Sequence, residues 1–259
     1  MWWRFSLIVL LSVWDTIDAR AYTTVCPPNV VEGVDVTQSN GPVTWGSVQG
    51  SGRGFAFARV SQGDYHTDDA FTTNWPNISA AGMLRSPFHF FDPTIDGVAQ
   101  ANYFLTLLNN AGGLQVRDLP PMLALECPTS STQSAADANC EYTGNSGWVP
   151  SSTLIQRVFD WLNTVEAATG RKPIIYSYPA WFADVGFTDV RLANYPLFIA
   201  TFASCASVPS PWTTAAFWQY GSASSIPGTT GSTDLDRFVG SPTELQVFVD
   251  TIFADGFDQ

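Results

Sequence analysis

The sequence predicts an α/β fold, a single-domain (β/α) barrel. Eight short apolar segments of strand length recur along the chain, and segments with helical spacing separate the early ones. Alternating strands and helices are typical of parallel sheets, and barrels of this kind close with eight strands. The second half of the chain is short of helical sequence. An open doubly wound sheet is the alternative, but no glycine-rich phosphate loop supports it.

The expected strands and helices follow from apolar runs between turn residues. The strands cover residues 30–36, 54–60, 86–91, the run between the prolines at 120–121 and 128, and then 173–178, 195–201, 215–220 and 233–238. Helices are expected at 74–82, 98–109 and 151–169, with a helical turn at 181–185. Ser151 is the expected cap of the 151–169 helix, and Gly170 its end. Ser241 and Glu244 predict a capping box that opens a final helix.

The first residues carry the features of a secretion signal. Arg4 gives a positive start, an apolar segment runs from Phe5 to Trp14, and Ala19-Arg20-Ala21 offers small residues around a cleavage point. The apolar segment is too short to span a bilayer. We therefore expect residues 1–21 to be a signal peptide and residues 22–259 to form one secreted, extracellular barrel domain.

The four cysteines predict two disulfides, because an exported chain meets an oxidising environment. Three pairings are possible, and proximity along the chain favours Cys127 with Cys140 and Cys26 with Cys205. No cysteine pair has metal-ligand spacing and the chain has only two histidines, so we expect neither a metal nor a cofactor.

Composition restricts the partners. The net charge is −12 and Lys172 is the only lysine, which argues against nucleic acid and anionic membranes as partners. The chain also contains ten Trp, eight Tyr and eighteen Phe. Aromatic faces suit sugar rings, although most of these residues belong to a core. We expect a monomer that acts on a glycan.

Three carboxylates lie at strand ends that a barrel brings together. Asp35 lies near the end of the first strand, Glu126 ends the fourth, and Asp234 lies on the eighth. Strands one and eight are neighbours in a closed barrel, and strand four lies across from them. Carboxylates on opposite walls of a cleft are the groups that glycoside hydrolysis uses. Glu126 follows an apolar strand, where burial favours the protonated acid, while Asp234 or Asp35 is expected to stay ionised.

An ordered set of segments carries a family resemblance. The segments are Gly33-Val34-Asp35-Val36-Thr37-Gln38, Phe55-Ala56-Phe57-Ala58-Arg59, Phe88-His89-Phe90, Leu123-Ala124-Leu125-Glu126, Ile175-Tyr176-Ser177, Tyr195-Pro196-Leu197-Phe198-Ile199-Ala200, Phe217-Trp218-Gln219-Tyr220 and Asp234-Leu235-Asp236-Arg237-Phe238. In order and spacing they resemble glycoside hydrolase family 25, the lysozymes (N-acetylmuramidases) that cut peptidoglycan between N-acetylmuramic acid and N-acetylglucosamine. The resemblance implies an irregular (β/α)5(β)3 barrel, with Glu126 as general acid and Asp35 and Asp234 as active-site aspartates.

The chain departs from the family pattern at one position of the fourth strand. The family carries Asp-x-Glu there, and this chain has Ala124 in place of the Asp, which is the family's candidate nucleophile or charge stabiliser. Two hypotheses follow. Either the enzyme still hydrolyses the glycan, with the substrate's 2-acetamido oxygen attacking the anomeric carbon, or the cleft binds peptidoglycan or a chitin-like glycan without efficient hydrolysis. A secreted structural or adhesion protein on the same scaffold is a third hypothesis.

Four further residues are candidates for substrate binding. Tyr176 and Trp218 follow apolar strand residues near the expected rim, where their rings could stack on sugars. Asp236 lies two residues beyond Asp234 and therefore on the same strand face. Phe90 comes from the third strand. Arg59, which ends an apolar strand, is expected to pair with a carboxylate inside the protein.

Overall fold

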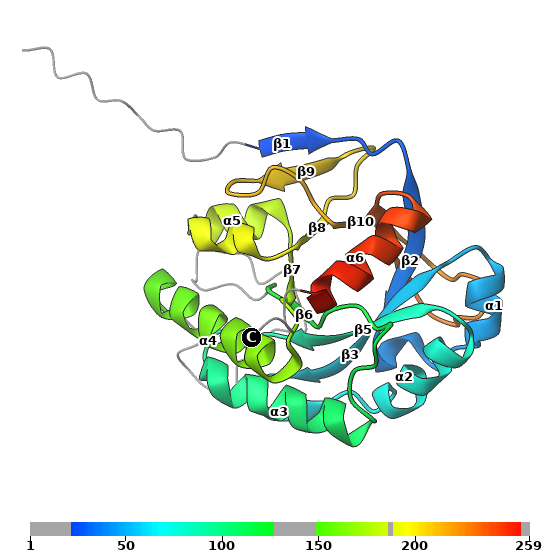
Figure 1. Cartoon of the computed structure of the whole chain (residues 1–259), viewed down its shortest axis with the longest axis horizontal. Coiled ribbons are helices and arrows are strands. Elements are labelled where there is room, and N and C mark those ends of the chain that lie inside the picture. Colours follow the sequence, from blue (N-terminus) through cyan, green and yellow to red (C-terminus); the bar gives the residue numbers. More distant parts are fainter. Residues whose placement is uncertain (1–21, 127–148, 186–188, 255–259) are drawn as a thin grey trace, which may run out of the picture.

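A closed barrel of eight strands forms the centre of the protein (Figure 1). The fold is taken from a computed structural model, which describes residues 22–126, 149–185 and 189–254. The barrel strands are β2 (Val30–Val36), β3 (Phe55–Gln62), β5 (Leu84–Phe90), β6 (Met122–Ala124), β7 (Ile174–Ser177), β8 (Leu197–Ala200), β10 (Phe217–Ala223) and β11 (Thr233–Val239). The expected α/β barrel is confirmed.

The barrel closes through one strand that runs against the others. Going round from β2, the order is β3, β5, β6, β7, β8 and β10, and each of these neighbouring pairs is parallel. The last strand, β11, is antiparallel both to β10 and to β2. Parallel neighbours need a crossover connection, whereas β11 follows β10 through a hairpin and therefore reverses direction.

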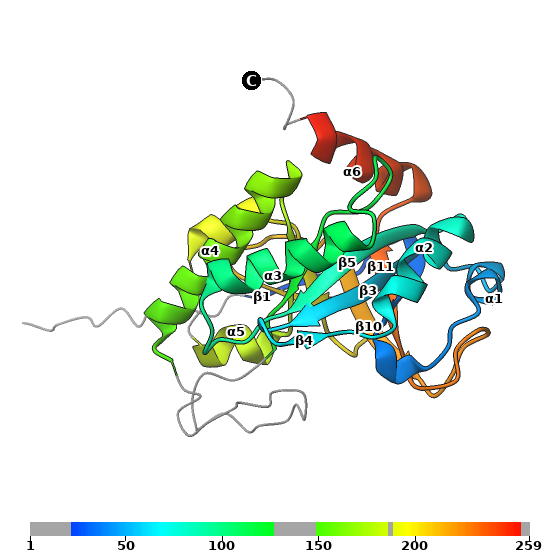
Figure 2. The same cartoon turned by 90° about the horizontal axis from the view of Figure 1, so that it is seen from below.

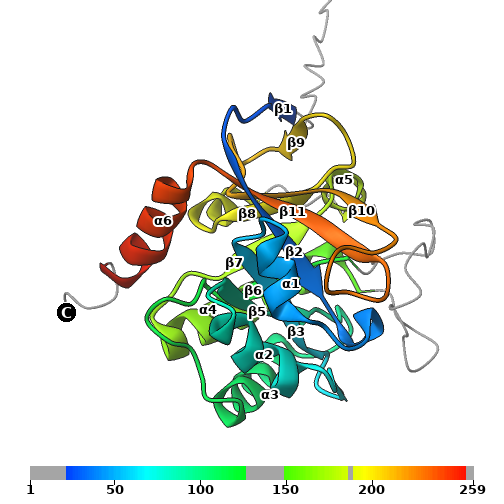
Figure 3. The ribbon, with the colours of Figure 1, turned by 90° about the vertical axis from the view of Figure 1, so that its right-hand side faces the viewer.

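Helices lie between the early strands and are missing between the late ones. They are α1 (Trp45–Gly50), α2 (Phe71–Ala80), α3 (Gly97–Asn110), α4 (Ser151–Thr169), α5 (Pro179–Val185) and α6 (Pro242–Ala254), with short 3-10 helices at Gln38–Asn40 and Val190–Asn194. Figure 3 shows α2, α3 and α4 together on one flank of the barrel. Five strand–helix units followed by three strands give the (β/α)5(β)3 arrangement.

Two helix ends test the capping predictions. The expected serine cap of α4 is wrong, because Pro150 occupies the cap position and Ser151 is the first helical residue. Gly170 ends this helix with φ 65°, a left-handed conformation that glycine adopts without strain. The capping box of α6 is confirmed: the Ser241 amide donates to Glu244 Oε2 at 2.7 Å, and the Glu244 amide donates to Ser241 Oγ at 3.3 Å.

Aromatic side chains fill the end of the barrel that α6 covers. Inward-facing positions alternate along each strand, and Phe57 contacts Phe198 and Phe217 at ring-centroid distances of 5.0 and 5.2 Å. On β2 the neighbouring position is Gly33, where a Cβ atom would lie 2.3 Å from the Phe55 ring. Helix α6 lies across this end of the barrel (Figure 2), and its Phe248 packs on Phe217 at 5.6 Å. One end of the barrel is therefore closed, which leaves the other for a site.

A small two-stranded sheet lies beside the barrel and was not expected from the sequence. It pairs β1 (Tyr22–Val25) with β9 (Ala206–Pro209) in antiparallel register, and the two-residue strand β4 (His66–Thr67) is a further addition at the barrel edge. The disulfide between Cys26 and Cys205 joins the ends of β1 and β9, as expected. The predicted partners Cys127 and Cys140, the long loop around them and residues 1–21 lie outside the described residues.

Candidate active site

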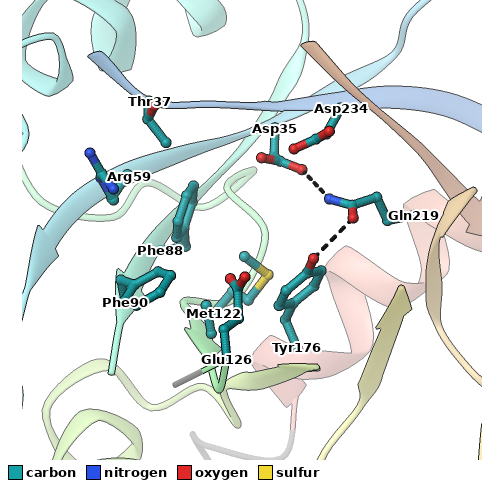
Figure 4. A pocket seen from close by; sticks show the side chains of 11 residues that line it. Asp35, Thr37, Arg59, Phe88, Phe90, Met122, Glu126, Tyr176, Gln219 and Asp234 are labelled. Atoms are coloured by element: carbon teal, nitrogen blue, oxygen red, sulfur yellow. Dashed lines mark hydrogen bonds between the residues drawn. The ribbon is translucent and has the colours of Figure 1, made fainter. Parts of the chain in front are cut away.

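A polar pocket opens at the barrel end opposite α6. On β11, Phe238 packs against α6 and Asp234 lies at the other end of the strand, so the strand runs from the site to the closed end. The pocket has a volume of about 120 Å³. It is lined by Asp35, Thr37, Arg59, Phe88, Phe90, Met122, Ala124, Glu126, Tyr176, Gln219 and Asp234 (Figure 4). The three carboxylates expected at strand ends are therefore brought together.

Asp35 and Asp234 face each other directly across two paired strands. They are register partners in the antiparallel ladder of β2 and β11, so their side chains lie on the same, inward face. Asp35 lies near the carboxyl end of β2, whereas Asp234 is the second residue of β11. Because β11 runs against its neighbours, its beginning lies at the rim where the parallel strands end. Both carboxyl groups are partly exposed to the pocket.

Glu126 enters the pocket from the opposite wall (Figure 4). Strand β6 has only three residues, and Glu126 follows it by two positions. The chain there is fixed by its neighbour β7, since the Leu125 amide donates to the Tyr176 carbonyl at 2.9 Å and Tyr178 donates its hydroxyl to the Glu126 carbonyl at 3.3 Å. Ala124 also lines the pocket, because it is two residues before Glu126 and residues at this spacing in an extended chain lie on the same face.

A chain of hydrogen bonds holds Asp35 in place. Tyr176 donates its hydroxyl to Gln219 Oε1 at 2.9 Å, and Gln219 Nε2 donates to Asp35 Oδ2 at 2.9 Å. Tyr176 and Gln219 are both buried, and burial raises the pKa of the Tyr176 phenol well above its usual value, with Glu126 and Asp35 adding to the shift. The phenol therefore stays a donor, which fixes which way the Gln219 amide points.

The environment of the Asp35–Asp234 pair favours a bound proton. Burial, followed by the nearby Asp234 carboxylate, raises the pKa of Asp35 to about 8, while the Gln219 hydrogen bond and Arg59 act in the opposite direction. Burial also raises the pKa of Asp234. Two close carboxyl groups resist ionising together, so the pair titrates as a unit that holds one proton near neutral pH.

Asp236 lies below this pair and outside the pocket lining. It is 0 % exposed, and neither of its carboxyl oxygens has a hydrogen-bond partner among the described residues. Burial, with Asp35 and Asp234 nearby, raises its pKa well above the usual value. Burial thus favours the protonated form of Asp236, which lies behind Asp234 rather than against a ligand in the pocket.

The other candidate substrate-binding residues divide into two groups. Tyr176 and Phe90 line the pocket. Trp218 does not: it is 1 % exposed, its indole Nε1 donates to the Thr201 carbonyl at 2.7 Å, and the Arg237 guanidinium lies 5.4 Å from its ring centroid. The structure thus places Trp218 in the barrel wall, on the face turned away from the pocket.

Gln219 and Arg59 are among the pocket residues to which the sequence assigns no role in the site. Gln219 connects Tyr176 to Asp35, and a signal for it exists, because it is two residues from the inward-facing Phe217. Arg59 pairs with Asp68 at 2.9 Å, as expected of a buried arginine, but it also lines the pocket.

Among the described residues no group of three or more His, Cys, Asp or Glu side chains is arranged to hold a metal ion. The helices of the described segments are also too short or too polar to span a bilayer.

Comparisons with known proteins place the chain in a family. The family model for glycosyl hydrolases family 25 matches residues 34–229. Lysozyme M1 of Streptomyces globisporus is 31% identical over 224 residues, which cover 83% of this chain and 70% of that protein. An N,O-diacetylmuramidase of Arthroderma benhamiae is 25% identical over 222 residues, covering 84% of this chain and 86% of the relative.

Comparison of the fold with solved structures agrees with the family model. The crystal structure of a bacterial lysozyme from Streptomyces coelicolor superimposes with a TM-score of 0.74 at 28% identity, covering 87% of this chain and 99% of the other. The family model, the relatives and the barrel all agree. The chain belongs to glycosyl hydrolase family 25 and is a glycoside hydrolase of the lysozyme type.

Proposed function

We propose that this protein is a secreted N-acetylmuramidase that cleaves the β-1,4 bond between N-acetylmuramic acid and N-acetylglucosamine in peptidoglycan. The observation that carries the proposal is the pocket in which the Asp35–Asp234 pair faces Glu126 across the barrel mouth. Family 25 membership and the muramidase and lysozyme relatives support the same substrate. Facing carboxyl groups supply the two functions that glycoside hydrolysis needs, an acid and a negative charge near the anomeric carbon.

Glu126 is the proposed general acid. It donates its proton to the glycosidic oxygen as the bond from that oxygen to the anomeric carbon breaks, so that the leaving sugar departs as a neutral alcohol. The resulting carboxylate then takes a proton from the water that attacks the anomeric carbon in the second step. The net reaction adds one water across the bond and restores the protonated acid.

The first step needs a nucleophile, and Ala124 cannot provide one. The substrate's own 2-acetamido oxygen is the proposed replacement, since substrate-assisted hydrolysis is an established route among glycosidases. The acetamido nitrogen gains positive charge as its oxygen bonds to the anomeric carbon. The ionised member of the Asp35–Asp234 pair accepts the hydrogen bond from that N–H, and the Tyr176–Gln219 chain keeps Asp35 oriented.

A binding protein without efficient hydrolysis is the second candidate, and Ala124 is the observation that favours it. The family resemblance puts a carboxylate at this position, and here a methyl group lines the pocket instead. Removing one positioned group from a catalytic set can lower kcat by several orders of magnitude. Such a protein keeps the cleft and its affinity for peptidoglycan or a chitin-like glycan.

The setting of the reaction is part of the proposal. Residues 1–21 have the sequence of a signal peptide, and the Cys26–Cys205 disulfide is consistent with an oxidising, extracellular environment. We propose that residues 22–259 act there as a monomer on a glycan, with no metal or cofactor, and with neither nucleic acid nor membrane as a partner.

The test identifies the sugar at the newly formed end. Purified peptidoglycan is digested, the products are reduced with borohydride, and the terminal sugar alcohol is determined by mass spectrometry. A muramidase leaves N-acetylmuramitol. Terminal N-acetylglucosaminitol alone would contradict the assignment of the bond, and no new reducing ends would leave the binding protein as the better account.

A further inference from the structure

A second, larger cavity adjoins the pocket and has no role in the steps above. Its volume is about 380 Å³. It shares Asp35, Thr37, Arg59 and Asp234 with the first pocket. Its remaining lining residues are polar: Gln38, Ser39, Asn40 and Ser232.

Arg59 forms part of the wall between the two spaces. The residue is only 8 % exposed, and its Nε donates to Asp68 Oδ2 at 2.9 Å. Within the described residues, neither terminal nitrogen of the guanidinium group has a hydrogen-bond partner. Arginine presents five N–H donors, and those of the terminal nitrogens of Arg59 are not among the buried side-chain atoms without a partner, so they are accessible from the cavity side. The Nη edge therefore offers donors to whatever enters the cavity, on the side where Thr37 lies (Figure 4).

The partner of Arg59 is itself fixed by backbone contacts. Asp68 is 1 % exposed and accepts from the Gln38 amide at 2.9 Å and from the Ala70 amide at 3.1 Å. This carboxylate therefore holds the Nε edge of Arg59 and the turn that carries Gln38 at the same time. The guanidinium group is positioned before any ligand binds.

The opposite wall is equally fixed. Asn40 Oδ1 accepts from the Thr37 amide at 2.7 Å, and Asn40 Nδ2 donates to the Ser232 carbonyl at 2.5 Å. Thr230 donates its hydroxyl to the Asn40 carbonyl at 3.2 Å. These bonds tie the turn after β2 to the loop between β10 and β11. A preformed polar cavity with an oriented donor is a binding site that loses little freedom when it is filled.

We propose that this cavity is a subsite for the sugar next to the one being cleaved, and that the Nη edge of Arg59 donates to the carbonyl oxygen of that sugar's N-acyl group. The inference rests on the proposed function for the identity of the glycan. Guanidinium donates only, so its ligand must supply an acceptor.

The charges in the cavity favour an uncharged acceptor over an anion. The Asp35–Asp234 pair retains negative charge when it holds one proton, and Asp68 already balances the charge of Arg59. A free carboxylate on the glycan would enter beside these like charges, whereas an acyl carbonyl group would not. Arg59 thus favours an uncharged acceptor, such as the carbonyl oxygen of an N-acyl group, over an anion.

The experiment compares two Arg-to-Lys variants in a Glu126→Gln background, so that binding is measured without hydrolysis. Affinity for tetra-N-acetylchitotetraose is determined by calorimetry. Arg59→Lys keeps a cation for Asp68 but removes the Nη donors that face the cavity. We expect affinity for the tetramer to fall by about tenfold or more, as loss of a charged hydrogen bond predicts. The matched control is Arg85→Lys, another buried arginine paired with an aspartate, Asp118 at 2.7 Å, outside both cavities. It should lower the melting temperature and leave affinity unchanged.

Three results would overturn the inference: an affinity of Arg59→Lys within about twofold of the background, an equal loss in Arg85→Lys, or no binding of the tetramer by the background protein. The inference would also be overturned if Arg59→Lys lost affinity only for peptide-free glycan strands that carry a free lactyl carboxylate. The ligand of Arg59 would then be an anion. Failure of the proposed function is scored separately. If the protein binds the tetramer through Arg59 but releases no reducing ends from peptidoglycan, the subsite is supported and the proposed hydrolase activity is contradicted.

Discussion

Asp35 on β2 and Asp234 on β11 are direct cross-strand partners, and this pairing sets the electrostatics of the cleft. Directly opposed residues on one face of an antiparallel pair have Cβ atoms about 5 Å apart, so the two carboxyl groups affect each other's ionisation. Burial and this proximity raise the pKa of Asp35 to about 8. The barrel thereby keeps a proton and a negative charge side by side at neutral pH.

The pairing predicts opposite shifts for two substitutions. Asp234→Asn removes a neighbouring negative charge, so the pKa of Asp35 should fall below its value of about 8. Gln219→Leu removes a hydrogen bond to the ionised form, so the pKa of Asp35 should rise. Carbon-13 NMR titration of labelled aspartate carboxyl groups measures both. Shifts in the same direction would show that the pair and the Tyr176–Gln219 chain do not control this proton.

Asp236 should make the protein less stable as pH rises. Its folded-state pKa lies well above the usual value of 3.8 for an aspartate, so between these values the folded state holds a proton that the unfolded state has released. Stability from this group is fully present below pH 3.8 and is lost as pH rises toward the folded-state pKa. Asp236→Asn mimics the neutral acid, so it should raise the melting temperature more at pH 8 than at pH 5.

His89 is the reason for comparing that variant with the wild type at each pH. Burial lowers the pKa of His89 to about 4, against a usual value of 6.5 for a histidine. Its contribution is present above pH 6.5 and is lost as pH falls through 4, the opposite sense to Asp236. The difference between variant and wild type cancels this histidine. An equal effect of Asp236→Asn at pH 5 and pH 8 would contradict the neutral state of Asp236.

The Cys26–Cys205 disulfide should contribute to stability and not to the site. It closes a sequence separation of 179 residues, and disulfides typically stabilise by about 2–4 kcal/mol, mainly by restricting the unfolded chain. Replacing both cysteines with alanine should lower the free energy of unfolding by about that amount in a denaturant titration. Because neither cavity is lined by a residue of β1 or β9, glycan affinity should stay the same. A large loss of affinity would mean that the small sheet supports the cleft.

Trp218 tests the assignment of the barrel wall. The indole is buried and bonded to the Thr201 carbonyl, so Trp218→Phe should lower stability by about 1–3 kcal/mol through lost packing and an unpaired carbonyl. Glycan affinity should be unchanged within about twofold. Phe90→Ala, at a position that lines the pocket, is the comparison and should weaken binding. If Trp218→Phe lowered glycan affinity without lowering stability, the assignment of Trp218 to the barrel wall would be contradicted and a contact with the glycan would be indicated.

The barrel and its carboxylates could be predicted because both depend on local patterns. Apolar runs between turn residues mark buried strands, and the ends of such strands meet at one rim of a barrel. Helix α4 was bounded correctly at residues 151–169 because its apolar spacing and Gly170 are both strong signals. Its cap was missed because the cap position holds a proline whose side chain makes no hydrogen bond.

The features that were missed depend on contacts between distant segments. Strand β1 is a short, mostly exposed segment whose partner β9 lies more than 180 residues away, so no local pattern reveals it. The place of Trp218 was decided by strand alternation: Phe217 and Gln219 face the barrel interior, and Trp218 must therefore face outward. The open edge of Arg59 could not be foreseen, because it depends on which edge Asp68 occupies.

The measurement that tests the central claim is release of reducing ends from purified peptidoglycan by three proteins side by side: wild type, Glu126→Ala and Ala124→Asp. The account predicts that the wild type is active and that Glu126→Ala is at least about a hundredfold slower, as loss of a general acid implies. Activity in Ala124→Asp alone would contradict it, because the natural cleft would then bind glycan without cutting it.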